Sequence, residues 1–165
     1  MRAAAATSLL LALVAAPGLA QEPRGSMSLA GPAVQRFVNQ DSRVSVLGYR
    51  RTDLRASGLG VDAAVGVVPA ALRALTLALH GDIGIARAVR ASRVTLLLQG
   101  GISNFIVLGH SLEFYPGLQA GTALMVPLEA RLVLRLDLAR RVYLASDEPY
   151  HYWSMGLSLP IMTVR

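Results

Sequence analysis

The stretch EARLVLRLDLARR, residues 129–141, limits the fold more than any other part of the sequence. Leucine occupies four even positions in a row, whereas Arg131, Arg135 and Asp137 occupy odd positions. Successive side chains of a β-strand point to opposite faces, so this order predicts a strand with one apolar face and one charged face. The chain must therefore build a sheet whose two faces meet different surroundings.

The same alternation recurs along the rest of the sequence. Clear two-residue periodicity marks strands at 59–67, 75–85, 118–126, 130–138 and 153–161. Weaker candidates lie at 26–30, 43–50 and 94–100, which gives about eight strands and no convincing helix. Turn residues separate these segments at 39–42, 56–58, 69–72, 100–103, 127–128 and 146–149.

The composition of the face opposite to the leucines indicates whether that face meets water or the inside of a barrel. Glycine, alanine, serine and threonine dominate that face, and the sequence has no lysine to solubilise a water-covered sheet. A narrow barrel interior needs small residues and a few charges that pair. We therefore expect an antiparallel up-and-down β-barrel with its leucines toward lipid and a polar network in its lumen. The network would comprise Asp62, His80, Asp82, Arg131, Arg135 and Asp137.

The hydrophobic content and the strand lengths agree with a membrane barrel. Hydrophobic residues make up 53% of the chain, yet after the first twenty residues no apolar run reaches the length of a spanning helix. A tilted spanning strand needs about 9–11 residues, and the segments 75–85 and 130–138 fit that length. An eight-stranded barrel is filled by its own side chains, so no wide channel is expected.

These features resemble a small bacterial outer-membrane β-barrel of the OmpA-like, eight-stranded type. The resemblance rests on FYPGLQAGTALMVPL followed by RLVLRLDL, and on the final strand WSMGLSLPI. It implies a place in the outer membrane of a Gram-negative envelope, with Pro127-Leu128 in a periplasmic turn and residues 101–111 and 145–149 in extracellular loops. Such barrels usually end in an aromatic residue, whereas this sequence ends in Arg165.

The first twenty residues form a separate unit. Arg2 supplies a positive start, LLLALVAA an apolar core, and Gly18-Leu19-Ala20 a small-residue cleavage site. This pattern predicts a secretory signal peptide at 1–20 and a single barrel domain at 21–165. The chain has no cysteine, so packing and hydrogen bonds must stabilise the exported domain without disulfides.

The charge of the chain indicates anionic partners. All 16 basic residues are arginine, and the formal net charge is +6. Export argues against a nucleic-acid partner, whereas the planar guanidinium suits the phosphates of lipid headgroups and lipopolysaccharide. A compositional bias toward alanine, arginine, leucine and glycine explains the arginines equally well. We expect a monomer in contact with outer-membrane lipid and lipopolysaccharide.

The sequence offers one weak catalytic candidate, the segment GHSLEF with His110, Ser111 and Glu113. Some eight-stranded outer-membrane barrels are lipid A deacylases that use a histidine, a serine and a carboxylate. Here the histidine and serine are neighbours, so a strand would turn them to opposite faces. His80 and Asp82 share a face but lack a third metal ligand. We expect no cofactor and no metal.

Three hypotheses for function follow from the sequence. The first, which we favour, is a non-catalytic outer-membrane barrel with a structural or interaction role at the cell surface. The second is a membrane-embedded enzyme resembling a lipid A deacylase. The third is a soluble periplasmic barrel that carries a lipophilic ligand, with its leucine face turned inward.

Overall fold

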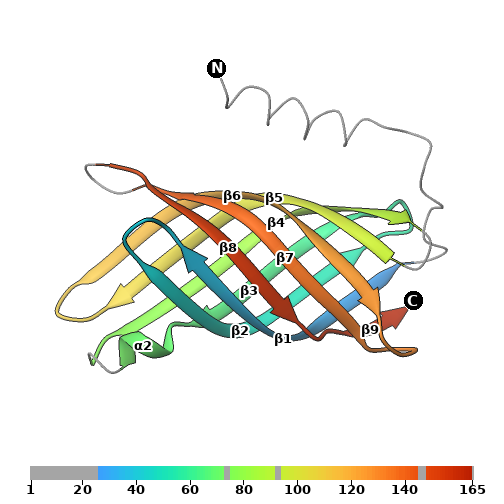
Figure 1. Cartoon of the computed structure of the whole chain (residues 1–165), viewed down its shortest axis with the longest axis horizontal. Coiled ribbons are helices and arrows are strands. Elements are labelled where there is room, and N and C mark those ends of the chain that lie inside the picture. Colours follow the sequence, from blue (N-terminus) through green and yellow to red (C-terminus); the bar gives the residue numbers. More distant parts are fainter. Residues whose placement is uncertain (1–25, 73–74, 92–93, 145–147, 165) are drawn as a thin grey trace, which may run out of the picture.

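The computed structural model describes residues 26–72, 75–91, 94–144 and 148–164. These residues form a closed antiparallel β-barrel (Figure 1). The predicted signal peptide, residues 1–20, lies outside the described residues, as do turn positions 146 and 147. None of the helical residues in the described ranges forms a helix long and apolar enough to cross a membrane.

Each strand pairs with the next in the chain, and β1 closes the barrel against β8 and β9. The strands β8 and β9 form one strand interrupted at Leu159-Pro160, where proline removes a backbone donor. The barrel therefore has the eight antiparallel strands that the sequence predicts. The elements are β1 Met27–Val38, β2 Arg43–Leu54, β3 Leu59–Val67, α2 Pro69–Leu72, β4 Leu77–Ala91, β5 Val94–Leu108, β6 Leu112–Pro127, β7 Val133–Tyr143, β8 Tyr150–Ser158 and β9 Ile161–Val164.

The two rims of the barrel differ in what they carry. Met27 at the start of β1 pairs with Val164 at the end of β9. We call this end, which also holds the turns at 55–58 and 128–132, the chain-end rim. The opposite end, which we call the loop rim, holds the turns at 39–42 and 109–111 together with α2 (Figure 1).

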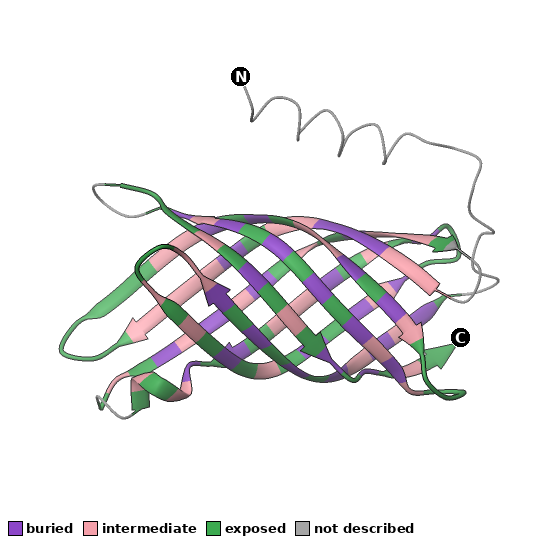
Figure 2. Cartoon of the chain, viewed as in Figure 1, coloured by how far each residue is buried: buried purple, intermediate pink, exposed green. Residues whose placement is uncertain are grey.

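Strand β7 shows the predicted division between the two faces. Arg135 and Asp137 are buried, whereas Leu136 and Leu138 are 44% and 48% exposed. Buried and exposed residues alternate in the same way along the neighbouring strands (Figure 2). The leucines therefore lie on the outer wall, which contradicts a soluble barrel with its leucine face inward. Other apolar side chains exposed on the wall include Val61, Val65, Ile83, Ile85, Ile102, Leu118, Met155 and Leu157.

The interior is layered along the barrel axis, and β7 crosses all of the layers. Near the chain-end rim, Val133 joins an apolar cluster that includes Leu29 and Leu97. In the middle, Arg135, Asp137 and Arg141 are surrounded by other buried polar side chains. Near the loop rim, Tyr143 packs in a second cluster made of Phe37, Val46, Val68 and Ala78. Charged groups are thus held at mid-height, between two apolar layers.

The expected turn at 100–103 is wrong, because these residues lie inside β5. A Cβ on Gly101 would lie 2.2 Å from the carbonyl oxygen of Ile83 on β4. The glycine therefore permits a close approach of two curved strands and does not make a turn. The extracellular loop expected at 101–111 shrinks accordingly to the short connection at 109–111.

The connection at 69–72 is a single helical turn, although the sequence predicted no helix. Pro69 begins it, and proline suits the first helical position because that backbone nitrogen needs no partner there. Gly58 takes a φ of 76° in the β2–β3 turn, as expected from the turn signal at 56–58. Glycine adopts this left-handed conformation without steric cost.

The lipid-facing assignment can be tested at Leu138, the middle residue of β7. Replacing Leu138 with arginine should cost about 2–4 kcal/mol of folding free energy in a bilayer, because a guanidinium would face hydrocarbon. Urea titrations of the barrel refolded in lipid vesicles measure this loss. Leu128→Arg, at an exposed turn residue, is the matched control and should change stability little. Equal stability of Leu138→Arg and the parent would contradict a lipid-facing position. Leu134 is a weaker place for this test. It also points outward, but it is the second residue of β7, and a charge so close to the end of the strand can reach water.

Candidate functional site

A first cluster of buried polar groups spans the lumen around Arg135. The Nη1 atom of Arg135 donates to Asp62 Oδ1 at 2.8 Å, and its Nη2 donates to Asp137 Oδ1 at 2.7 Å. Nη2 also donates to Gln99 Oε1 at 2.8 Å. One guanidinium on β7 thus contacts side chains from β3 and β5 across the interior. We call this group, together with Arg50 and Thr52, the Arg135 cluster.

Arg50 supplies the second guanidinium of the Arg135 cluster, so that the two positive charges match the two carboxylates. Arg50 donates from Nε and Nη2 to Asp62 Oδ2, at 3.0 and 2.5 Å, and its Nη1 lies 3.4 Å from Asp137 Oδ1. Thr52 donates its hydroxyl to Asp62 Oδ1 at 2.5 Å. Two arginines therefore face two aspartates, and all four are at most 9% exposed. Such pairing is what makes buried charges tolerable in a narrow interior.

A second cluster is centred on Arg141 and lies closer to the loop rim. Its Nη2 donates to Asp82 Oδ2 at 2.6 Å and to Gln119 Oε1 at 2.8 Å. Its Nη1 donates to Ser154 Oγ, and its Nε donates to Ser103 Oγ at 3.3 Å. We call these residues, with His80 and Tyr143, the Arg141 cluster.

His80 joins the Arg141 cluster to the aromatic layer above it. Its Nε2 lies 3.1 Å from Asp82 Oδ1, within ion-pair distance. Nε2 also lies 3.2 Å from Ser103 Oγ, and Ser103 shares a 2.8 Å hydrogen bond with Tyr143 Oη. The imidazole ring packs 4.8 Å from the ring of Phe105, centroid to centroid. His80 therefore lies between polar groups on one side, Asp82 and Ser103, and an aromatic ring, Phe105, on the other.

The structure brings together five of the six residues expected in the lumen. Arg135, Asp62 and Asp137 meet in one cluster, and His80 and Asp82 meet in the other. Arg131 does not join them, because β7 begins only at Val133 and Arg131 is exposed in the preceding turn. Its backbone carbonyl accepts a hydrogen bond from Met162 at 2.6 Å. The predicted lumen position of Arg131 is therefore wrong, because the prediction extended the alternation of faces beyond the first residue of β7.

Several lumen residues were missed by the sequence reasoning. Arg141 has the same parity as Arg135 and Asp137, so continuing the alternation to the end of the strand would have found it. Arg50 could not be found in this way, because RVSVLGYRRTDL carries apolar and polar residues on both parities. The other missed members are Thr52, Gln99, Ser103, Gln119, Tyr143 and Ser154.

The catalytic candidates lie apart from these clusters, exposed at the loop rim. Ser111 donates to Glu113 Oε1 at 3.4 Å, and Glu113 also accepts from the Tyr115 hydroxyl at 2.5 Å. His110 is exposed in the β5–β6 turn, and the bonds found for Ser111 and Glu113 do not include it. The geometry therefore lacks the serine–histidine contact that nucleophilic catalysis requires. No group of three histidine or acidic side chains in the described ranges could hold a metal ion.

The fold and the lumen define a closed eight-stranded β-barrel with an apolar outer wall and a charge-balanced interior. No family model matches the sequence. A search of curated proteins likewise finds no match. The architecture itself does have counterparts among solved structures, and several of these are outer-membrane proteins.

Three of these structures are close to this barrel in shape. The N-terminal β-barrel domain of OprF from Pseudomonas aeruginosa superposes with a TM-score of 0.64 at 9% identity, covering 84% of this chain and 98% of that one. OprG from Pseudomonas aeruginosa gives 0.61 at 8% identity, covering 89% and 99%. Neisserial surface protein A gives 0.56 at 15% identity, covering 86% and 97%. At these identities the likeness establishes a fold shared with small outer-membrane barrels.

The balance of the Arg135 cluster predicts a specific loss of stability. Asp62→Asn leaves Arg50 and Arg135 with one carboxylate between them, so it should cost about 3–5 kcal/mol of unfolding free energy. Denaturant unfolding measures this loss, with far-ultraviolet circular dichroism as the signal. Asp53→Asn is the matched control, since Asp53 pairs with Arg51 on the exposed outer face and should matter much less. Equal effects of the two substitutions would argue against a tightly coupled lumen network.

Proposed function

We propose that this chain is a non-catalytic outer-membrane β-barrel with a structural or interaction role at the surface of a Gram-negative cell. The observation that carries the proposal is the apolar outer wall, on which Ile83, Ile85 and Leu118 are each more than half exposed. Water-soluble proteins rarely expose so much contiguous apolar surface. A closed barrel, in contrast, satisfies its backbone hydrogen bonds within a bilayer and needs such a surface.

The lengths and pairing of the strands support this location. The strand β3 has nine residues, and β8 has nine before its interruption at Leu159-Pro160, which is near the minimum of about 9–11 for a tilted spanning strand. Both ends of the described barrel meet at the chain-end rim. In our proposal this rim faces the periplasm, and the loop rim with α2 faces outward.

The filled middle of the lumen argues against a continuous channel through the barrel. Arg135 and Arg141 are each 1% exposed, and their guanidinium groups hydrogen-bond across the lumen. An eight-stranded barrel has room for side chains but not for an aqueous channel in addition. The proposed role is therefore one of anchoring and surface contact, and it does not include passage of solutes.

Arginines on the outer wall near the loop rim support contact with lipopolysaccharide. Arg36, Arg43 and Arg140 are exposed and lie near the loop-rim ends of β1, β2 and β7. The Arg140 guanidinium lies 5.4 Å from the ring centre of Trp153, which holds it against the wall. Guanidinium groups bind phosphate oxygens through paired hydrogen bonds. This arrangement suits the phosphates of a surrounding lipopolysaccharide layer.

Cell fractionation tests the proposed location. The protein should stay in the outer-membrane pellet after washing with sodium carbonate and with high salt, because the apolar wall holds it in the bilayer. Immunoblots of the fractions measure its distribution, with a known periplasmic protein as the control for release. Recovery in the soluble periplasmic fraction would overturn the proposal.

Charge removal at the two rims tests the contact with lipopolysaccharide. The double variant Arg36→Gln with Arg140→Gln should weaken binding by about a hundredfold or more, because each of the two lost charged hydrogen bonds contributes about 1.5–3 kcal/mol. Titration of the refolded barrel with purified lipopolysaccharide measures the affinity. Arg55→Gln with Arg87→Gln removes the same charge near the chain-end rim and should leave the affinity unchanged. Equal losses of affinity in the two double variants would show that binding depends on net charge alone and would contradict a specific contact near the loop rim.

A further inference from the structure

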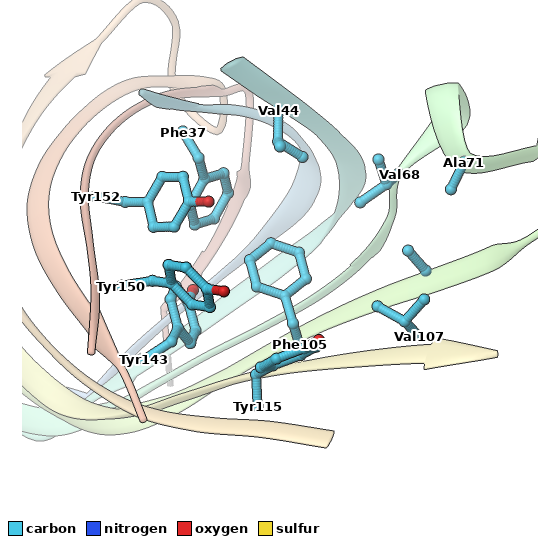
Figure 3. Close-up of a pocket in the computed structure, with 11 residues that line it drawn as sticks. Phe37, Val44, Val68, Ala71, Phe105, Val107, Tyr115, Tyr143, Tyr150 and Tyr152 are labelled. Carbon is cyan, nitrogen blue, oxygen red and sulfur yellow. The ribbon is translucent and has the colours of Figure 1, made fainter. Parts of the chain in front are cut away.

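A cavity of about 400 Å³ occupies the lumen between the Arg141 cluster and the loop rim. Six of the side chains around it are aromatic, and they come from five strands of the barrel (Figure 3). The remaining lining is aliphatic, and no charged side chain contributes to it. These aromatic residues are Phe37, Phe105, Tyr115, Tyr143, Tyr150 and Tyr152.

The polar atoms of this aromatic cavity are largely occupied by the protein itself. The Tyr143 hydroxyl bonds Ser103, the Tyr152 hydroxyl lies 3.1 Å from Ser42 Oγ, and the Tyr115 hydroxyl donates to Glu113. Water inside would find few hydrogen-bond partners, and a water molecule needs two to four of them to be held well. The cavity is therefore better suited to an apolar molecule than to solvent.

The rings are arranged to receive another ring. Phe105 lies 5.3 Å from Phe37 at an angle of 65°, and 5.1 Å from Tyr143 at an angle of 56°. Such tilted pairs present both edges and faces, which are the surfaces that aromatic contacts use. A volume near 400 Å³ lies within the range of small-molecule sites, about 300–1,000 Å³. The cavity therefore has room for one or two fused rings.

The floor of the aromatic cavity is closed and carries no net charge. The Arg141 guanidinium lies 4.7 Å from the ring centre of Phe37, and His80 packs against both Phe37 and Phe105. The charge of Arg141 is already met by Asp82. A charged molecule would lose hydration here without gaining an ionic partner, so the site selects against charge.

We propose that this aromatic cavity is a binding site for small uncharged ring compounds that enter from the loop rim. The closed floor means that a bound molecule goes no further along the barrel. The site rests on the lumen side chains alone and does not depend on the proposed membrane location or on contact with lipopolysaccharide. A protein found outside the membrane could still bind the ring compound, so the two proposals can fail separately.

Residue-resolved NMR of the isotopically labelled, refolded barrel tests the site with naphthol as the probe. Shift changes should saturate and concentrate at Phe37, Phe105, Tyr143 and their neighbours, since only a bound molecule would affect these inward positions selectively. Changes spread over the outer wall, without saturation, would show partition into the detergent and would overturn the proposal. Naphthalenesulfonate, which carries a charge on the same ring system, should bind at least about tenfold more weakly.

A substitution that fills the cavity with a larger side chain tests the site, and the same substitution on the outer wall is its matched control. Ala78 is buried and lines the cavity, so Ala78→Phe should abolish saturable naphthol binding. Ala120→Phe makes the same change on the exposed outer wall and should leave binding intact. Val107→Phe, at another lining position, serves if Ala78→Phe fails to refold. Binding that survives in a refolded filled variant would refute the site, and octanol binding as tightly as naphthol would refute the preference for rings.

Discussion

The ion pairs of Arg135 with Asp62 and Asp137 are the interaction on which the rest of the structure depends. Strands β3 and β7 are not neighbours in the sheet, so the bond between Arg135 and Asp62 crosses the lumen and ties separate parts of the wall. The charged side chains of this cluster are at most 9% exposed, so the loss of one partner leaves a buried charge uncompensated. The cluster stabilises one particular closure of the barrel and one register of its strands.

Small inward residues make room for these long side chains. Gly156 faces the lumen on β8, and a Cβ there would lie 3.1 Å from Asp137 Cβ and 3.4 Å from Gln35 Cγ. In this middle layer of the lumen, small inward residues such as Gly156 therefore lie beside the long charged side chains, while large apolar residues lie on the outer face. The alternation seen in the sequence is the consequence of a lumen that is narrow and charged.

The sequence predicted the faces of the barrel well because alternation is a local property. Leu136 and Asp137 are assigned to opposite faces by a period of two, with no knowledge of their partners. Which charges meet across the lumen depends on strand order and register, and Arg50 shows the limit, since its own strand lacks a clear pattern. Gly101 shows another limit, because glycine marks either a turn or a curved strand, and only the neighbouring strand distinguishes them.

The two ends of the lumen show that packing alone does not determine this interior. At the chain-end rim, Met27, Leu29 and Val133 close the polar layer with flexible and aliphatic side chains. At the loop rim, the corresponding layer is aromatic and encloses the cavity around Phe105. Either kind of side chain would shield the charged clusters from water, so the aromatic character at one rim is not a requirement of the fold. Features that a fold does not require are where function is to be sought, because a barrel of this shape serves many roles and its sites distinguish them.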